Sequence, residues 1–265
     1  EAIGAGTDVV ANVDVASGSG NVSVLGARDV KFTGTADILT TSTAAGSGSI
    51  DVMAGSGSVT QSATSLFQTT GATGTIRVLG QVDVTVGDIV SATGTVSVTA
   101  TTGNILDADP LLAGPADDAD IDVTANKLRL FAGTGVGQNT NHLETTVGTV
   151  SARATSGGIY LRETDGLIVD DVGLSVNRVG SDGTTGTGSS TDALQSDVRT
   201  TAGNGNIVIR SNGGTITLND GTATADDTGV SANGTGNVLL EAIGAGTDVV
   251  ANVDVASGSG NVSVL

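Results

Sequence analysis

An exact internal copy constrains this chain more than any other feature of its sequence. Residues 1–25, EAIGAGTDVVANVDVASGSGNVSVL, recur letter for letter as residues 241–265. A fixed period is the signature of repeat architectures, in which each unit stacks on its neighbours. We therefore divide the chain into one full tandem period, residues 1–240, and the start of the next, residues 241–265. We expect both to belong to a longer tandem array.

A shorter phrase recurs inside the period. Small or polar residues lead into alternating aliphatics in GNVSVL (20–25), GSIDVM (48–53), GTIRVL (74–79), GTVSVT (94–99) and GNIVIR (205–210). An apolar residue at every second position is typical of a strand with one buried face. Such strands, stacked in successive coils, would bury a continuous aliphatic column that no single coil could bury.

The first aliphatic of each phrase aligns the coils. Nine coils per 240-residue period are predicted by taking as equivalent Val22, Ile50, Ile76, Val96, Ile121, Val150, Val176, Ile207, Val238 and Val262. A second strand follows nine residues later in several coils, as from Ile50 to Val59, across a glycine-containing turn. A fainter third strand precedes the next coil. The sequence thus predicts an all-β fold, a parallel β-solenoid with about three short strands per coil.

Composition supports a narrow core and excludes some partners. The chain has 41 Gly, 3 Phe, 1 Tyr, no Trp and no Cys, so aliphatic side chains must fill the core and no disulfide can brace it. The formal net charge is −18, which argues against nucleic acid as a partner because no basic patch could neutralise phosphates. No apolar run approaches the roughly 20 residues of a membrane span.

Three segments carry a family resemblance. GTVSVTATTGNI (94–105), GTVSARATSGGIYL (148–161) and GNIVIRSNGGTITL (205–218) resemble the repeat region of filamentous haemagglutinin-like adhesins and other giant bacterial surface proteins. The resemblance covers nearly the whole chain and implies a right-handed parallel β-helix. It also implies a secreted, surface-attached or filament-forming bacterial protein.

An Asp-rich segment is the main candidate for a site. We take Asp117, Asp118 and Asp120 as calcium candidates, within a group that also contains Asp107, Asp109 and Asp122. Calcium needs several carboxylate and carbonyl oxygens. The alternative is a solvated Asp-rich turn, since neither EF-hand spacing nor a calcium-binding nonapeptide repeat is present. The only histidine, His142, is expected to be an exposed loop residue without a catalytic role.

Several functions remain open at this point. The first is a structural extracellular filament or adhesin stalk, whose partners are adjacent repeats stacked end to end, further copies side by side, or surface glycans. The second is a module that binds glycans or calcium through the polar insertions 106–120 and 177–195. The third is a β-helix polysaccharide-degrading enzyme, for which we find no clustered catalytic residues and no cofactor motif. A fourth, ice binding, would need aligned threonine rows, which we do not find.

Overall fold

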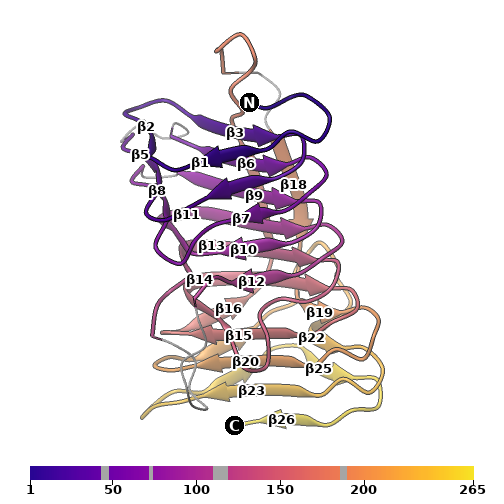
Figure 1. Ribbon diagram of the computed structural model, residues 1–265. Coiled ribbons are helices and arrows are strands. Elements are labelled where there is room, and N and C mark those ends of the chain that lie inside the picture. The colour runs from indigo at the N-terminus through magenta and orange to yellow at the C-terminus, as the bar shows by residue number, and fades with distance from the viewer. Residues whose placement is uncertain (43–47, 72–73, 110–118, 186–189) are drawn as a thin grey trace.

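The chain folds into a stack of parallel strands. The computed structural model describes residues 1–42, 48–71, 74–109, 119–185 and 190–265. Strands and turns make up the described residues, and none of them is helical. No helix in the described ranges is long and apolar enough to cross a membrane. The strands lie across the long axis of the stack and the two termini lie at its opposite ends (Figure 1). The prediction of an all-β fold with large parallel sheets is confirmed.

In the first part of the chain, the strands form three parallel ladders, and each strand from β1 to β8 pairs with the strand three places later. One ladder consists of β1 (Val9–Ala11), β4 (Val30–Phe32), β7 (Val59–Thr60), β10 (Val84–Val86) and β12 (Ile105–Asp107). A second contains β2 (Val15–Ser17), β5 (Ile38–Thr40), β8 (Leu66–Thr69) and the first halves of β11 (Asp88–Ala100), β13 (Val123–Ala132) and β14 (Leu143–Ala154). A third contains β3 (Val22–Gly26), β6 (Ile50–Ala54), β9 (Thr75–Gly80) and the second halves of β11, β13 and β14.

The second part of the chain continues these ladders with a new set of strands. The longest ladder runs through β15 (Ile159–Glu163), β20 (Ile207–Ser211), β23 (Val238–Ala242) and β26 (Val262–Val264). Another runs through β16 (Leu167–Val169), β21 (Ile216–Leu218) and β24 (Val249–Ala251). A third runs through β19 (Val198–Thr200), β22 (Thr228–Ala232) and β25 (Asp254–Ser257). Strand β14 pairs with both β16 and β19, so it joins the two parts.

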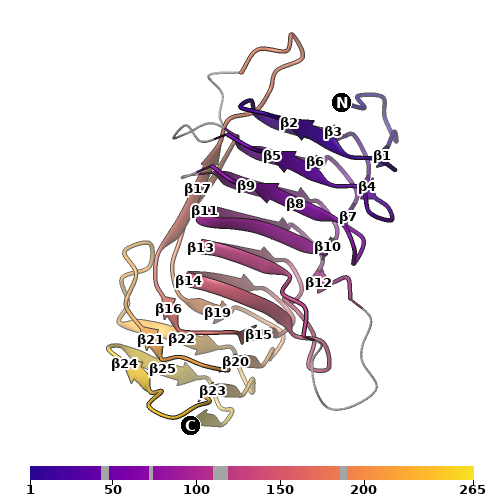
Figure 2. The same cartoon turned by 90° about the vertical axis from the view of Figure 1, so that its left-hand side faces the viewer.

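One hairpin departs from this pattern. Strands β17 (Val172–Val176) and β18 (Ser190–Gln195) pair antiparallel with each other. They run along the side of the stack rather than across it (Figure 2). The segment 177–195, which the sequence marks as a polar insertion, therefore contains part of this hairpin.

Five of the ten aligned positions differ from the prediction. Ile207, Val238 and Val262 pair with one another in the ladder that leads back to Val9, and not in the ladder of Val22. The other two differ individually. Val176 lies in the hairpin and not in a parallel ladder. The residue opposite Val96 is Leu128, not Ile121. The insertion 106–120 and the hairpin both interrupt the spacing of the phrases, so counting along the sequence selected the wrong aliphatic at these two places.

The core is a column of aliphatic side chains, as the composition predicts. Ile50, Ile76 and Val96 are stacked in one ladder and are fully buried. The only aromatic pair in the core among the described residues is Phe32 with Phe67, whose ring centroids lie 4.8 Å apart in an edge-to-face arrangement. Similar side chains repeat at each level because every coil offers nearly the same cross-section.

The two identical segments occupy different ladders. Val22 in β3 pairs with Ile50. Its copy, Val262 in β26, pairs with Val238 instead. Followed back from Val238, that ladder passes through Ile207, Ile159, Val136, Ile105, Val84, Val59 and Val30 to Val9. The second copy thus enters the stack on the side where β1 began, and not on the side of β3.

Candidate functional site

Buried charges fasten the hairpin to the stack. Arg77 on β9 donates from Nε to Asp192 Oδ1 of β18 at 2.9 Å and from a terminal nitrogen to Asp51 Oδ1 of β6 at 3.2 Å. All three side chains are buried, and Asp51 is fully so. Ser97 Oγ donates to the second oxygen of Asp192 at 2.7 Å. Charges removed from water need such complete pairing, because an unpaired one would be strongly destabilising.

The pairing continues to both ends of the hairpin. Near its base, Gln195 donates from Nε2 to the carbonyl of Leu130 at 2.9 Å. Further along, Arg129 Nε donates to the carbonyl of Ala193 at 3.0 Å. Burial lowers the pKa of Arg129, and the nearby Asp192 charge opposes that shift. Arg129 therefore joins the hairpin to an outward-facing position of β13, and Gln195 joins it to the backbone of the core residue Leu130.

The hairpin's far end contacts the first coils. Arg178 Nε donates to Asp51 Oδ2 at 2.6 Å, and the Val179 backbone N–H donates to Ser23 Oγ at 2.9 Å. Asn21 Nδ2 donates to Thr185 Oγ1 at 3.3 Å. The hairpin therefore spans from β14 back to β3, and we call residues Val179–Thr185 its tip. From the sequence, charged residues at outward strand positions such as Asp51 and Arg77 are visible, but nothing indicates their partners more than a hundred residues away.

A group of three carboxylates is the best metal candidate among the described residues. One oxygen each of Asp107, Asp122 and Glu144 lies within 4.8 Å of the other two. Asp122 and Glu144 are buried, and the Glu144 backbone N–H donates to Asp122 Oδ2 at 2.7 Å. Burial, with the neighbouring Asp107 charge, raises the pKa of Asp122 strongly. Either protonation or a hard cation such as calcium would relieve the repulsion in this group.

The calcium candidates taken from the sequence lie at the edge of this group. Asp117 and Asp118 fall outside the described residues. Asp120 is exposed, accepts the backbone N–H of Ile121 at 3.0 Å and does not belong to the three-carboxylate group. The structure brings Asp107 and Asp122 from the same Asp-rich group together. Glu144 was missed because only the register of β13 against β14 places it beside Asp122.

His142 is not the exposed loop residue that we expect from the sequence. Its side chain is buried, and its ring stacks on Tyr160 with centroids 5.9 Å apart and an interplanar angle of 7°. The expectation was wrong because strand β14 begins at Leu143, directly after His142, and β15 packs beside it. The position is therefore a packing site between two neighbouring strands.

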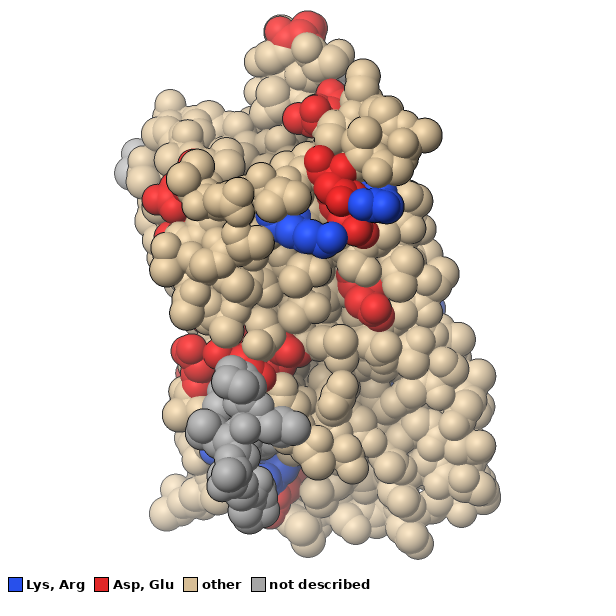
Figure 3. All heavy atoms as spheres, in the orientation of Figure 1, with Lys and Arg blue, Asp and Glu red and all other residues tan. Residues whose placement is uncertain are grey.

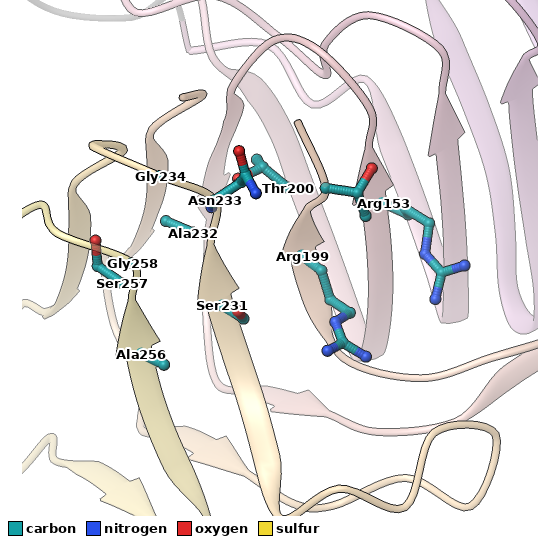
Figure 4. A pocket seen from close by; sticks show the side chains of 11 residues that line it. Arg153, Arg199, Thr200, Ser231, Ala232, Asn233, Gly234, Ala256, Ser257 and Gly258 are labelled. Atoms are coloured by element: carbon teal, nitrogen blue, oxygen red, sulfur yellow. The ribbon is translucent and has the colours of Figure 1, made fainter. Parts of the chain in front are cut away.

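A hollow near the C-terminal end is lined by two arginines. Arg153 and Arg199 are opposite each other on β14 and β19, and Figure 4 shows their guanidinium groups extending from neighbouring strands beside Ser231 of β22. Two guanidinium groups could hold an anion such as a carboxylate or sulfate. Arg199, however, already forms ion pairs with Asp226 at 2.9 Å and Asp197 at 3.5 Å. The charge available to a ligand is correspondingly small.

The surface carries its charge in a few patches. On the face seen in Figure 3, most side chains are uncharged and the basic ones lie beside acidic ones. Arg28 pairs with Asp8 at 2.6 Å, and Lys31 lies 3.2 Å from Asp29. With a net charge of −18, such pairs leave most of the acidic side chains unbalanced. No family model, curated protein or solved structure matches this chain.

Proposed function

We propose that the chain is one unit of a tandem β-solenoid that forms a structural filament or adhesin stalk outside the cell or at its surface. The observation that carries the proposal is the stacking of the second copy. Its strands β24, β25 and β26 pair in parallel with the strands before them, so a further unit can extend the same sheets. A role of this kind needs length and stiffness rather than a catalytic centre.

The proposed unit has nine coils wound in a right-handed sense. In support, the ladder from Val9 to Val262 advances in nine steps, each to the next strand on the same side, over 253 residues, so a 240-residue unit takes up slightly less than nine coils. Backbone hydrogen bonds between coils run along the axis. At a strand spacing of about 4.8 Å, one unit would extend the rod by about 43 Å.

Electron microscopy of chains with one, two and four units tests this proposal. We expect unbranched rods of constant width whose length increases by about 43 Å per added unit. The single-unit chain is the control for width. Compact particles, or globules separated by flexible linkers, would contradict the filament.

Calcium binding is the second candidate function, favoured by one observation. Three carboxylate oxygens from Asp107, Asp122 and Glu144 converge within 4.8 Å in a largely buried position. We expect millimolar calcium, but not magnesium, to raise the thermal midpoint of the chain, because calcium accepts irregular oxygen sites that magnesium does not. Asp122→Asn should abolish the increase, whereas Asp120→Asn should keep it, because the exposed Asp120 lies outside the three-carboxylate group. An unchanged midpoint in calcium would refute this candidate.

A further inference from the structure

The hairpin tip extends past the first coil of its own unit. Arg178 contacts Asp51 in β6, and Val179 contacts Ser23 in β3. Between these two consecutive residues, the hairpin therefore advances by one coil toward the N-terminal end of the stack. Beyond Val179, residues 180–185 are exposed. Figures 1 and 2 both show the tip projecting from the end of the stack, beyond β3. In a tandem array, that space belongs to the preceding unit.

The tip has a defined shape of its own. Val179 and Thr185 are bridged antiparallel, and the Gly180 N–H donates to the Thr184 carbonyl at 2.8 Å. Asp182 Oδ1 accepts the Thr184 backbone N–H at 3.0 Å and its hydroxyl at 2.7 Å. Gly183 has a φ of 78°, which a glycine adopts at little cost. These hydrogen bonds give the exposed tip one conformation without help from a partner.

The exact copy identifies the surface on which the tip would lie. Ser263 is the copy of Ser23, and it pairs with Leu239 of β23. Leu239 in the preceding unit therefore lies one coil beyond Ser23, directly in the path of the tip. The outward row continues from Leu239 to Val208 and Tyr160. Leu239 and Val208 are aliphatic, Tyr160 is aromatic, and all three are half-buried.

The same register makes successive units rotate. Val262 enters the ladder that leads back to Val9, whereas Val22 lies in the ladder of Ile50. Each unit is thus rotated about the long axis of the stack relative to the unit before it, so that a given strand falls on the next of the three ladders. Without this turn, the tip would lie over the continuation of the β3 ladder, which passes through β14 into the ladders of β16 and β19. Ser231 of β22 is an outward-facing position of the second of these ladders.

We propose that the tip of each hairpin lies on the β15–β20–β23 sheet of the preceding unit, covers its Leu239–Val208 row and so fastens neighbouring units together. The partner is a second copy of this chain's own repeat. This inference rests on the tandem stacking proposed above and adds where the contact falls. Because the units rotate, successive hairpins follow a helical path around the rod.

Cysteine cross-linking in a two-unit chain tests the proposal, since these 265 residues contain no Cys. Ser181→Cys is placed in the second unit and Leu239→Cys in the first, and a bismaleimide with a short spacer is added. The matched control replaces Leu239→Cys with Ser231→Cys, which is also half-buried but lies on the other ladder. We expect the first pair to link at least about tenfold faster than the control, because the two thiols are held at high effective concentration.

The outcomes separate this inference from the proposed function. Circular dichroism and electron microscopy of each variant establish that it folds and forms a rod. A continuous rod in which Ser231→Cys links faster, or in which neither pair links, would overturn the placement of the tip while leaving the filament intact. Two separated particles in place of a rod would contradict the filament itself.

Discussion

Arg77 is buried between two carboxylates. It bonds to Asp51 and Asp192, and Arg178 completes the coordination of Asp51 from the opposite side. Burying a charge without a partner costs far more than the net gain from a well-paired one. The network therefore specifies where the hairpin lies, more than it adds to total stability.

Asp51→Asn tests this at the level of one residue. We expect it to lower the free energy of unfolding by about 3–5 kcal/mol, because it leaves the charge of the buried Arg77 undercompensated. Urea denaturation followed by circular dichroism measures the change. Asp8→Asn, which removes the exposed pair with Arg28, should leave the denaturation midpoint almost unchanged. Equal effects of the two substitutions would mean that the buried network is not important for folding.

Glu163 makes stability depend on pH. Its side chain is fully buried, and burial raises its pKa to about 8 against the opposing hydrogen bonds from Thr145 and Val147. The folded chain therefore holds a proton that the unfolded chain releases near pH 4.5. The contribution of Glu163 to the free energy of unfolding is fully present below pH 4.5 and is lost as the pH rises to about 8. For one such group, the free energy of unfolding falls by up to about 1.4 kcal/mol for each pH unit in this range.

Denaturation series from pH 5 to pH 8 measure this dependence. We expect the free energy of unfolding to fall across that range, with burial of Asp88, whose pKa is raised to about 6, contributing in the same direction. Glu163→Gln should reduce the slope and leave the part that comes from Asp88. Glu241→Gln, at the half-buried Arg210 pair, is the control and should retain it. A stability that rises with pH over this range would contradict the assignment.

At the scale of elements, the hairpin and the ladders are held by different interactions. The parallel strands are bonded on both sides by neighbouring coils, while β17 and β18 bond to each other and to the stack mainly through side chains. Elements with few backbone bonds to the rest of a fold open at lower free energy. The hairpin is thus expected to open before the ladders do.

Asp192→Asn should make this difference measurable. The substitution weakens the bonds to Arg77 and Ser97, so amide hydrogen exchange in β17 and β18 should accelerate while exchange in β13 stays nearly constant. Asp220→Asn, at an exposed position outside the hairpin, serves as the control. Uniform acceleration throughout the chain would show that the hairpin opens only together with the whole stack.

At the scale of the whole molecule, the stack has two open ends. Strand β26 has a neighbour only on the β23 side, and Val262, Val264 and Leu265 are exposed there to 43%, 49% and 68%. Unpaired backbone groups and an uncovered aliphatic column favour association with another copy. The 265-residue chain should therefore associate end to end.

Light scattering at increasing protein concentration tests this association. We expect the apparent mass to rise with concentration, and Val264→Lys to suppress the rise because a charge directed into the open end of the core opposes stacking. Ser259→Lys, in a turn beside the same strand, should have little effect. A monomer that persists at all concentrations would contradict end-to-end assembly.

The sequence alone determined the kind of fold. Period-two alternation in GNVSVL and its relatives indicates strands with one buried face, and the exact copy indicates stacking of equivalent units. Both are local properties that one stretch of chain carries by itself, and the described structure bears out the all-β class and the parallel sheets. The sequence also marked Asp107 and Asp122, which the structure brings together.

Only the tertiary structure decided which coil each strand stacks in and what covers the outside. Leu128 rather than Ile121 faces Val96, the hairpin takes Val176 out of the ladders, and the second copy enters on a different side from the first. The physical reason is that backbone hydrogen bonds between parallel strands are the same for every aliphatic residue. Register therefore depends on the length and path of the connecting segments, and these are settled only when the distant parts of the chain pack together.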